Sequence, residues 1–270
     1  MVYEDPTGQN PPLTWHHNGL NNVRAVIAWL RQNLPQPRQM LDTGCSAGGT
    51  GALVNHHFFR SRLAPHWGYL LSDSGPVFEA SGDQDPSWRL HQTIRQVWGL
   101  DPMLATFRSE VPGLDPDNLG SIYRALSRAW PGDRLGVVQF QQDAIYSAYS
   151  YERFFDDILN APDEATRKAR ILARWHADNA RLKALLDDPE LSNWAYYIPN
   201  YRNLNDSHCA TIVEFENSDV QEDVVQPGLQ DFVERLTNPD RPLRSSWEQD
   251  QAADYNKPFN PFYAFLNALL

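Results

Sequence analysis

Residues 40–52 have the sequence MLDTGCSAGGTGA, and this stretch decides how the rest of the chain is arranged. It predicts a short strand, a tight turn at Ser46 and then a helix. Gly44, Ser46 and Gly48 match the G-x-S-x-G pattern of a nucleophile elbow. A turn this sharp crowds the positions two residues before and two residues after the serine. We therefore expect Gly44 and Gly48 to be needed because they lack a Cβ atom.

The predicted helix begins at Ala47, directly after the turn. The amides of Ala47 and Gly48 have no partner inside such a helix and lie at its positive end, which suits a developing oxyanion. Gly49 and Gly51 would let the helix approach the sheet. A bare G-x-S-x-G also occurs by chance, because glycine and serine are common residues. The strand-like residues before the turn and the small residues after it favour a nucleophile.

The length and composition are compatible with one large α/β domain or two small ones. The chain has 270 residues, of which 41% are hydrophobic, and we expect a single α/β domain over 1–270 with an irregular tail over about 238–270. The net charge of -11 argues against a nucleic-acid partner. No apolar run is long enough for a membrane span, and the first residues lack the features of a signal peptide. Two cysteines are too few for a disulfide scaffold.

Apolar runs and helical periodicities alternate along the chain. This alternation predicts an α/β fold with a mostly parallel sheet and crossover helices. The predicted strands are the elbow strand, 67–71, 135–140, 194–198 and 210–215. The predicted helices are 18–34, 47 to about 60, 86–98, 116–130, 163–187 and 229–236, and the inner face of the helix 163–187 is assigned to Ala165, Ala169, Leu172, Ala173, His176, Ala180, Leu182 and Leu185.

Four chemically versatile side chains follow or adjoin predicted strands. They are Ser46, Asp73, Asp143 and His208. In parallel sheets, ligands bind beyond the carboxyl ends of the strands. We therefore expect these residues to lie near one edge of the sheet.

A serine nucleophile needs a base, and the base needs an acid that orients it. In α/β-hydrolases these residues follow one another in the order Ser, Asp or Glu, His. Only His176 and His208 lie far enough after Ser46 to be the base. His208 is preferred because it lies in a polar loop between predicted strands, whereas His176 lies on a predicted helix face. From the pattern alone, Asp143 and Asp73 both remain candidates for the acid.

Four segments resemble the pectin acetylesterase family. Residues 44–49, GCSAGG, resemble its G-[CS]-S-A-G-G signature, and residues 137–143, VVQFQQD, are similar to its V-V-Q-W-x-x-D. Ser207-His208-Cys209 resembles its S/x-H-C motif, and the segment from His16 to Asn22 resembles the one before the family's elbow. The resemblance covers roughly 13–214. It implies an α/β-hydrolase-like fold and an extracellular or periplasmic protein.

The resemblance also implies roles for particular residues. Asp143 becomes the triad acid and His208 the base. Asp73, Ser74 and Gly75 become candidates for the wall of the substrate pocket. The sequence departs from the family because a glycine-rich G-G-G-W-C loop, which supplies further oxyanion donors, has no counterpart before Ser46. We therefore expect a fragment or shortened member in which the N-terminal strands are missing, with reduced activity as one outcome.

The two cysteines adjoin the candidate serine and histidine. If Ser46 and His208 meet, then Cys45 and Cys209 lie in neighbouring segments and could form a disulfide. We expect two small buried thiols instead, because Cys45 lies on a strand whose face need not point toward His208.

The resulting hypothesis is a serine esterase that hydrolyses a short acyl ester, most simply an O-acetyl group on a carbohydrate. Its triad is Ser46, Asp143 and His208, with Ala47 and Gly48 as oxyanion donors and a small-molecule or carbohydrate ester as substrate. No cofactor is implied, and the histidine pairs lack zinc-ligand spacing. The alternatives are a non-catalytic binder of a glycan or partner on the same scaffold, and a longer-chain lipid-ester or protein deacylase of the Notum type.

Overall fold

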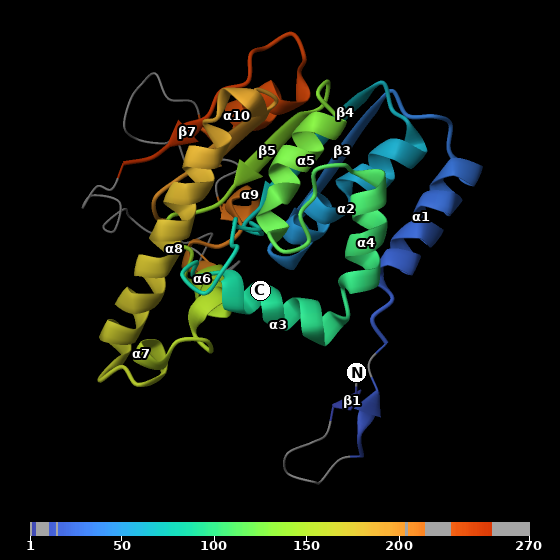
Figure 1. The fold of residues 1–270 in the computed structure, drawn as a ribbon. Coiled ribbons are helices and arrows are strands. Elements are labelled where there is room, and N and C mark those ends of the chain that lie inside the picture. Colours follow the sequence, from blue (N-terminus) through green and yellow to red (C-terminus); the bar gives the residue numbers. More distant parts are fainter. Residues whose placement is uncertain (1, 4–10, 15, 203–204, 214–227, 250–270) are drawn as a thin grey trace.

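The chain folds around one parallel sheet. The computed structural model describes residues 2–3, 11–14, 16–202, 205–213 and 228–249. Within these residues the sheet has five strands, all parallel, and neighbours in the sheet are also neighbours in the sequence. The strands are β3 (Gln39–Cys45), β4 (Trp67–Asp73), β5 (Arg134–Val138), β6 (Trp194–Ile198) and β7 (Ser246–Trp247). The prediction of an α/β fold is confirmed (Figure 1).

Helices cover both faces of this sheet (Figure 1). Adjacent residues of a strand point to opposite faces, so Leu70 and Val137 pack in one apolar cluster while Leu71 and Val138 pack in another. The larger cluster lies under α1, α2 and α4 to α8, and the smaller one lies under α9 and α10. The helices are α1 (Gly19–Asn33), α2 (Ala47–Leu63), α3 (Trp88–Trp98), α4 (Asp101–Glu110), α5 (Ile122–Ala129), α6 (Ala144–Tyr151), α7 (Asp156–Leu159), α8 (Glu164–Leu186), α9 (Ala210–Val213) and α10 (Leu229–Thr237).

Most predicted elements are confirmed, with ends that differ by a few residues. The elbow strand and the helix after it are β3 and α2, and the two continuous apolar runs that follow are β4 and β5. The predicted helix 116–130 is shorter than expected, because α5 begins only at Ile122 after a 3-10 turn over Leu119–Ser121. Helices α4 and α6 were not predicted. The tail expected to be irregular contributes β7 within its described part, and residues 250–270 lie outside the described residues.

The predicted inner face of α8 is right only in part: Leu182 and Leu185 are buried and Leu172 packs against the core, but the predicted alanines and His176 are exposed. Trp175 and Asp178 are instead fully buried. The buried face includes Asp178 and Asn179, polar residues that hydrophobic periodicity does not detect. Asp178 can be buried because its carboxylate accepts hydrogen bonds from Ser87 Oγ at 2.6 Å and Tyr151 OH at 2.7 Å.

The predicted strand over 210–215 is also wrong. Residues 210–213 form the short helix α9, and 214–215 lie outside the described residues. The apolar run Ala-Thr-Ile-Val suits a strand by propensity, but the carboxylate of Asp73 accepts the first amides of this segment. A tertiary hydrogen bond therefore decides the local structure here.

Among the helices that the structure describes, none combines the length and apolar character needed to cross a bilayer.

Candidate active site

The turn at Ser46 has the strained backbone that the sequence predicts. Ser46 has φ 57° and ψ -124°, so this residue lies in a region that L-residues rarely occupy. Its amide donates to the Asp73 carbonyl oxygen on the neighbouring strand at 2.9 Å, and its own carbonyl accepts from the Thr50 amide at 3.1 Å. These bonds fix both sides of the turn between β3 and α2. The Ser46 side chain is partly exposed at the end of the sheet.

Crowding explains only some of the elbow glycines. A Cβ atom on Gly44 would lie 2.4 Å from the Gly48 carbonyl oxygen, and one on Gly49 would lie 2.2 Å from the Asp73 carbonyl oxygen. A Cβ atom on Gly48 or Gly51 would meet nothing within 4 Å. The steric roles expected for Gly48 and Gly51 are therefore wrong, because Gly44 alone leaves enough space for the turn and Gly49 alone makes the close helix–strand contact.

The first amides of α2 are available beside Ser46. Ala47 and Gly48 are exposed, and within the described part of the chain no hydrogen bond uses their backbone N–H groups. The first amides of a helix lack intrahelical partners and carry a partial positive charge. They are suitable donors for an oxyanion, and the role predicted for them stays a prediction.

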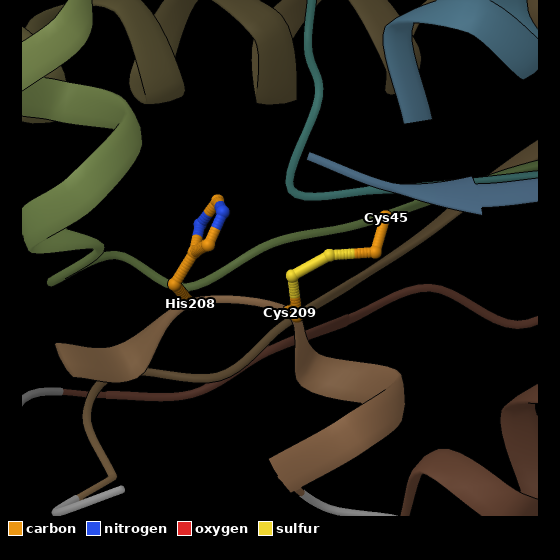
Figure 2. Close-up of side chains that lie close together, drawn as sticks. All are labelled: Cys45, His208 and Cys209. Carbon is orange, nitrogen blue, oxygen red and sulfur yellow. A yellow bond between two sulfur atoms is a disulfide. The ribbon is translucent and has the colours of Figure 1, made fainter. Parts of the chain in front are cut away.

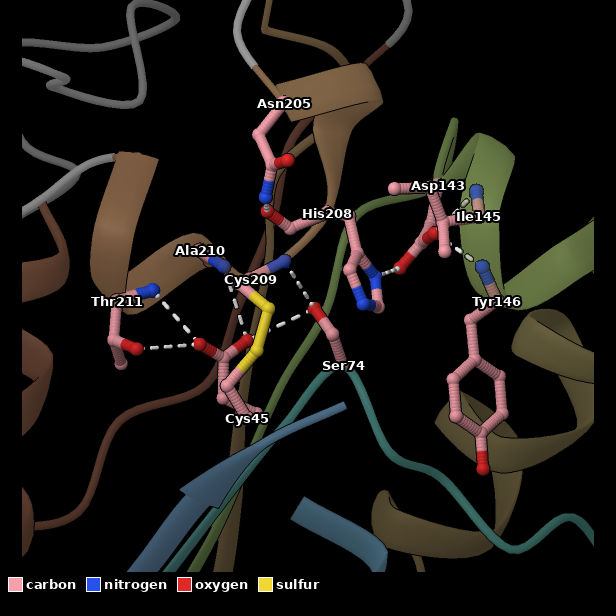
Figure 3. The surroundings of a disulfide bond; sticks show 11 residues. Cys45, Ser74, Asp143, Ile145, Tyr146, Asn205, His208, Cys209, Ala210 and Thr211 are labelled. Atoms are coloured by element: carbon pink, nitrogen blue, oxygen red, sulfur yellow. Dashed lines mark hydrogen bonds and ion pairs between the residues drawn. A yellow bond between two sulfur atoms is a disulfide. The ribbon is translucent and has the colours of Figure 1, made fainter. Parts of the chain in front are cut away.

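His208 and Asp143 come together although 65 residues separate them. His208 Nδ1 lies 2.7 Å from Asp143 Oδ2, and both side chains are buried (Figure 3). The other oxygen, Oδ1, accepts the amides of Ile145 and Tyr146 at 3.0 and 2.8 Å, so Asp143 also caps α6. Burial raises the pKa of Asp143, while the bonds from His208 and the two amides oppose this shift. When Asp143 is ionised and the imidazole is neutral, Nδ1 donates to the carboxylate and Nε2 keeps its lone pair.

Cys45 and Cys209 form a disulfide, so the expectation of two free thiols is wrong (Figure 2). Their Cα atoms are 5.6 Å apart, and their sequence separation is 164. Residues Asn205, Asp206, Ser207 and Cys209 all have positive φ, and this coil turns the Cys209 side chain back toward the end of β3. The disulfide joins the residue before Ser46 to the residue after His208.

This disulfide places the serine and histidine segments side by side. A ring nitrogen of His208 and the two sulfur atoms all lie within 4.8 Å of one another. Within the described residues, Ser46 Oγ makes no hydrogen bond to His208. Hydrogen bonds between a nucleophile and its base are often long in the free enzyme and shorten when substrate binds.

Asp73, Ser74 and Gly75 form the base of the site. Asp73 and Ser74 are fully buried, and their side chains bond to residues 209–211, which follow His208. A Cβ atom on Gly75 would lie 2.3 Å from the Ser46 carbonyl oxygen. These contacts show a supporting role, and a place in a pocket wall stays a prediction. Asp73 does not contact His208 as an acid would, because Asp143 occupies that position.

Tyr146 is a neighbour of the site that the sequence analysis missed. Its ring stacks on His208 with centroids 6.5 Å apart, and its hydroxyl lies 2.9 Å from Thr50 Oγ1 on α2. Burial raises the pKa of Tyr146 to about 12, so its hydroxyl stays protonated. The sequence did contain a signal for Tyr146. If Asp143 caps a helix, the residue three positions later lies in the first turn of that helix, close to Asp143.

The remaining candidate ligands and bases lie elsewhere or are occupied. His176 is exposed on α8, which leaves His208 as the histidine beside the elbow. Cys45, His208 and Cys209 are close enough to share a metal ion. In the oxidised state shown here the sulfur atoms are bonded to each other, so neither is a thiolate that could ligate a metal.

A comparison of the sequence with known protein families and with curated proteins finds no match. The functional assignment therefore depends on the geometry of the site.

Proposed function

We propose that this protein is a serine esterase that works through an acyl-enzyme. The observation that carries the proposal is the buried His208–Asp143 pair, 2.7 Å apart, joined through the Cys45–Cys209 disulfide to the strained turn at Ser46. A serine hydroxyl is a poor nucleophile, and the arrangement supplies the base and the acid that it lacks. The order Ser46, Asp143, His208, with each residue following a parallel strand, matches an α/β-hydrolase-like fold.

The proposed reaction has two halves. Ser46 Oγ attacks the ester carbonyl while His208 Nε2 removes its proton, and the amides of Ala47 and Gly48 bind the oxyanion. The protonated imidazole then delivers this proton to the leaving alcohol, and the acyl group stays on Ser46. Water attacks the acyl-enzyme with the same base and releases the acid. Asp143 keeps the proton on Nδ1 and stabilises the imidazolium in both halves.

The substrate class comes from the resemblance to pectin acetylesterases. We propose a short acyl ester, most simply an O-acetyl group on a carbohydrate. The net charge of -11 would disfavour strongly anionic polymers unless the site is locally basic.

The direct test is hydrolysis of p-nitrophenyl acetate and longer p-nitrophenyl esters by the wild type and by Ser46→Ala. We expect turnover by the wild type, a preference for the acetyl ester and loss of at least about 10³-fold in kcat in the variant. Equal rates for the two proteins would remove Ser46 from the mechanism. A preference for long acyl chains would favour the deacylase alternative, and an inactive wild type that binds acetylated oligosaccharides would favour the non-catalytic binder.

A further inference from the structure

We infer that Asp73 is a positioning residue that fixes the position of Ser46 relative to His208. This inference rests on the proposed function, because it assigns Asp73 a task in the esterase site. Asp73 is the last residue of β4, paired with Cys45 in the sheet, and its side chain is fully buried. It therefore lies between the segment that carries the nucleophile and the segment that carries the base.

The Asp73 carboxylate binds the chain directly after His208. Oδ1 accepts the Ala210 amide at 3.0 Å, and Oδ2 accepts the Thr211 amide at 2.9 Å and the Thr211 hydroxyl at 2.6 Å. In Figure 3, dashed lines run from Ala210 and Thr211 to one carboxylate beside the disulfide. Three donors from two consecutive residues thus converge on one side chain.

Ser74 extends the same contact by one residue. Its hydroxyl accepts the Cys209 amide at 2.9 Å and donates to Asp73 Oδ1 at 2.9 Å (Figure 3). Its own amide donates to the Val138 carbonyl oxygen at 2.7 Å, so Ser74 is fixed to β5. As a result, the amides of residues 209, 210 and 211 are all held by the end of β4.

The backbone of Asp73 holds the nucleophile. Its carbonyl oxygen accepts the Ser46 amide at 2.9 Å, and Gly49 of α2 packs against the same carbonyl group. One residue therefore bonds to the elbow through its main chain and to the histidine segment through its side chain. A change at Asp73 would therefore shift the elbow that carries Ser46 relative to the segment that carries His208.

The complete burial of the Asp73 carboxyl group makes a purely structural role a poor explanation. No ion pair compensates this carboxylate within the residues that the structure describes, and burial raises its pKa. Burying a carboxylate without a cation is unfavourable, and bonds to neutral donors offset that cost only in part. The bonds also hold a segment in which Ser207 and Cys209 have positive φ, a conformation that persists only when its surroundings enforce it.

The test compares Asp73→Asn with a matched control, Asp163→Asn. Asp163 also accepts a helix-capping amide, from Thr166 at 2.7 Å, but it is exposed at the start of α8. We expect Asp73→Asn to lower kcat by about 10²-fold with little change in KM, because misplacing a catalytic group by about 1 Å has an effect of this size. Asp163→Asn should retain wild-type kcat. Thr211→Val should lower kcat less than Asp73→Asn does, and Thr211→Ser, which keeps the hydroxyl, should restore it.

A second readout does not depend on turnover. The proton on His208 Nδ1 in its short bond to Asp143 should give a far-downfield NMR signal in the wild type. We expect this signal to shift or broaden in Asp73→Asn and Thr211→Val and to stay unchanged in Thr211→Ser. If Asp73→Asn does not fold, the two Thr211 variants carry the test. Unchanged kcat and an unchanged signal in the folded variants would overturn the inference.

The two proposals fail in different ways. A wild type that neither hydrolyses esters nor reacts at Ser46 with a fluorophosphonate overturns the esterase proposal, whatever the Asp73 variants do to the NMR signal. A wild type that reacts at Ser46, with Asp73→Asn reacting equally fast, overturns only the positioning role.

Discussion

At the scale of single residues, two aspartates of this site each perform two tasks. Asp143 caps α6 with one oxygen and binds His208 with the other. Asp73 bonds to Ser46 through its carbonyl group and to Thr211 through its carboxylate. Because both oxygens of each carboxylate have fixed partners, neither side chain can rotate freely. The positions of the proposed catalytic groups therefore depend on helix ends that the same residues stabilise.

Replacing Asp143 with asparagine should largely abolish catalysis while preserving the fold. Asparagine still accepts the α6 amides, but it no longer forces the proton onto His208 Nδ1, so the wrong tautomer is favoured. We expect kcat for p-nitrophenyl acetate to fall by about 10³–10⁴-fold, the size typical of a triad aspartate. The measurement is steady-state kinetics, with circular dichroism to check folding. A loss smaller than about tenfold would mean that Asp143 is not the acid.

Asp42 should make the stability of the protein depend on pH. It lies on β3, its Oδ2 has no hydrogen-bond partner among the described residues, and His56 Nδ1 is 3.9 Å away. Burial raises the pKa of Asp42 from 3.8 to about 7. The folded state thus favours the protonated acid, so the stability it contributes is complete below pH 4 and is lost as the pH rises through 7.

The variant Asp42→Asn replaces this acid with a neutral side chain of the same shape. We expect its free energy of unfolding in urea to match the wild type near pH 4 and to exceed it by on the order of 2–4 kcal/mol above pH 8. A difference that stays constant from pH 4 to pH 8 would show that Asp42 does not titrate in this window.

At the scale of elements, the site depends on how closely α2 approaches β4. Gly49 is buried against the Asp73 carbonyl group, whereas Gly51, two residues later on the same helix, faces open space. This difference arises because α2 touches the strand on one side only. The same pair of glycines provides a matched experiment on this contact.

Substituting Gly49 with alanine should destabilise the protein and impair the site, because its Cβ would lie 2.2 Å from the Asp73 carbonyl oxygen. We expect a loss of about 1–3 kcal/mol in the free energy of unfolding together with slower labelling of Ser46 by a fluorophosphonate. Gly51→Ala should instead be neutral or stabilising by up to about 1 kcal/mol, since alanine is the better helix former. Similar behaviour of the two variants would contradict this account of the helix–strand contact.

At the scale of the whole molecule, the Cys45–Cys209 disulfide connects distant parts of the sheet. It joins the end of β3 to the segment after β6, across a sequence separation of 164. A bridge that closes a loop of this length restricts the unfolded chain strongly. It also places the residues next to Ser46 and His208 in covalent contact. Fold stability and site geometry are therefore coupled to the redox state.

Reduction of the Cys45–Cys209 disulfide should lower both the stability of the fold and the activity of the site. In buffer with a phosphine reductant we expect the free energy of unfolding to fall by about 2–5 kcal/mol and kcat to decrease, with recovery after reoxidation. The control is the double variant Cys45→Ala/Cys209→Ala, which should resemble the reduced wild type and should not respond to the reductant. A reduced wild type with unchanged stability would show that the disulfide does not constrain the chain.

The sequence by itself determined four of the five strands of the parallel sheet, β3 to β6, together with the elbow and the order of the candidate triad. Continuous apolar runs identify β4, β5 and β6, because a strand buried on both faces needs apolar residues throughout. The glycine pattern around Ser46 identifies the turn, although only Gly44 and Gly49 in this stretch lack room for a Cβ atom. The choice of His208 over His176 also came from the sequence, since the chain order left few alternatives.

Only the tertiary structure decided the contacts between segments far apart in sequence. It pairs His208 with Asp143 rather than Asp73, a choice that the residue pattern alone left open and the family resemblance implied. It also shows that residues 210–213 form a helix and that the two cysteines form a disulfide. It also selected the buried face of α8, where Asp178 finds partners on other segments. Each of these outcomes depends on hydrogen bonds or a covalent bond to a distant residue, and local periodicity and propensity contain no information about such partners.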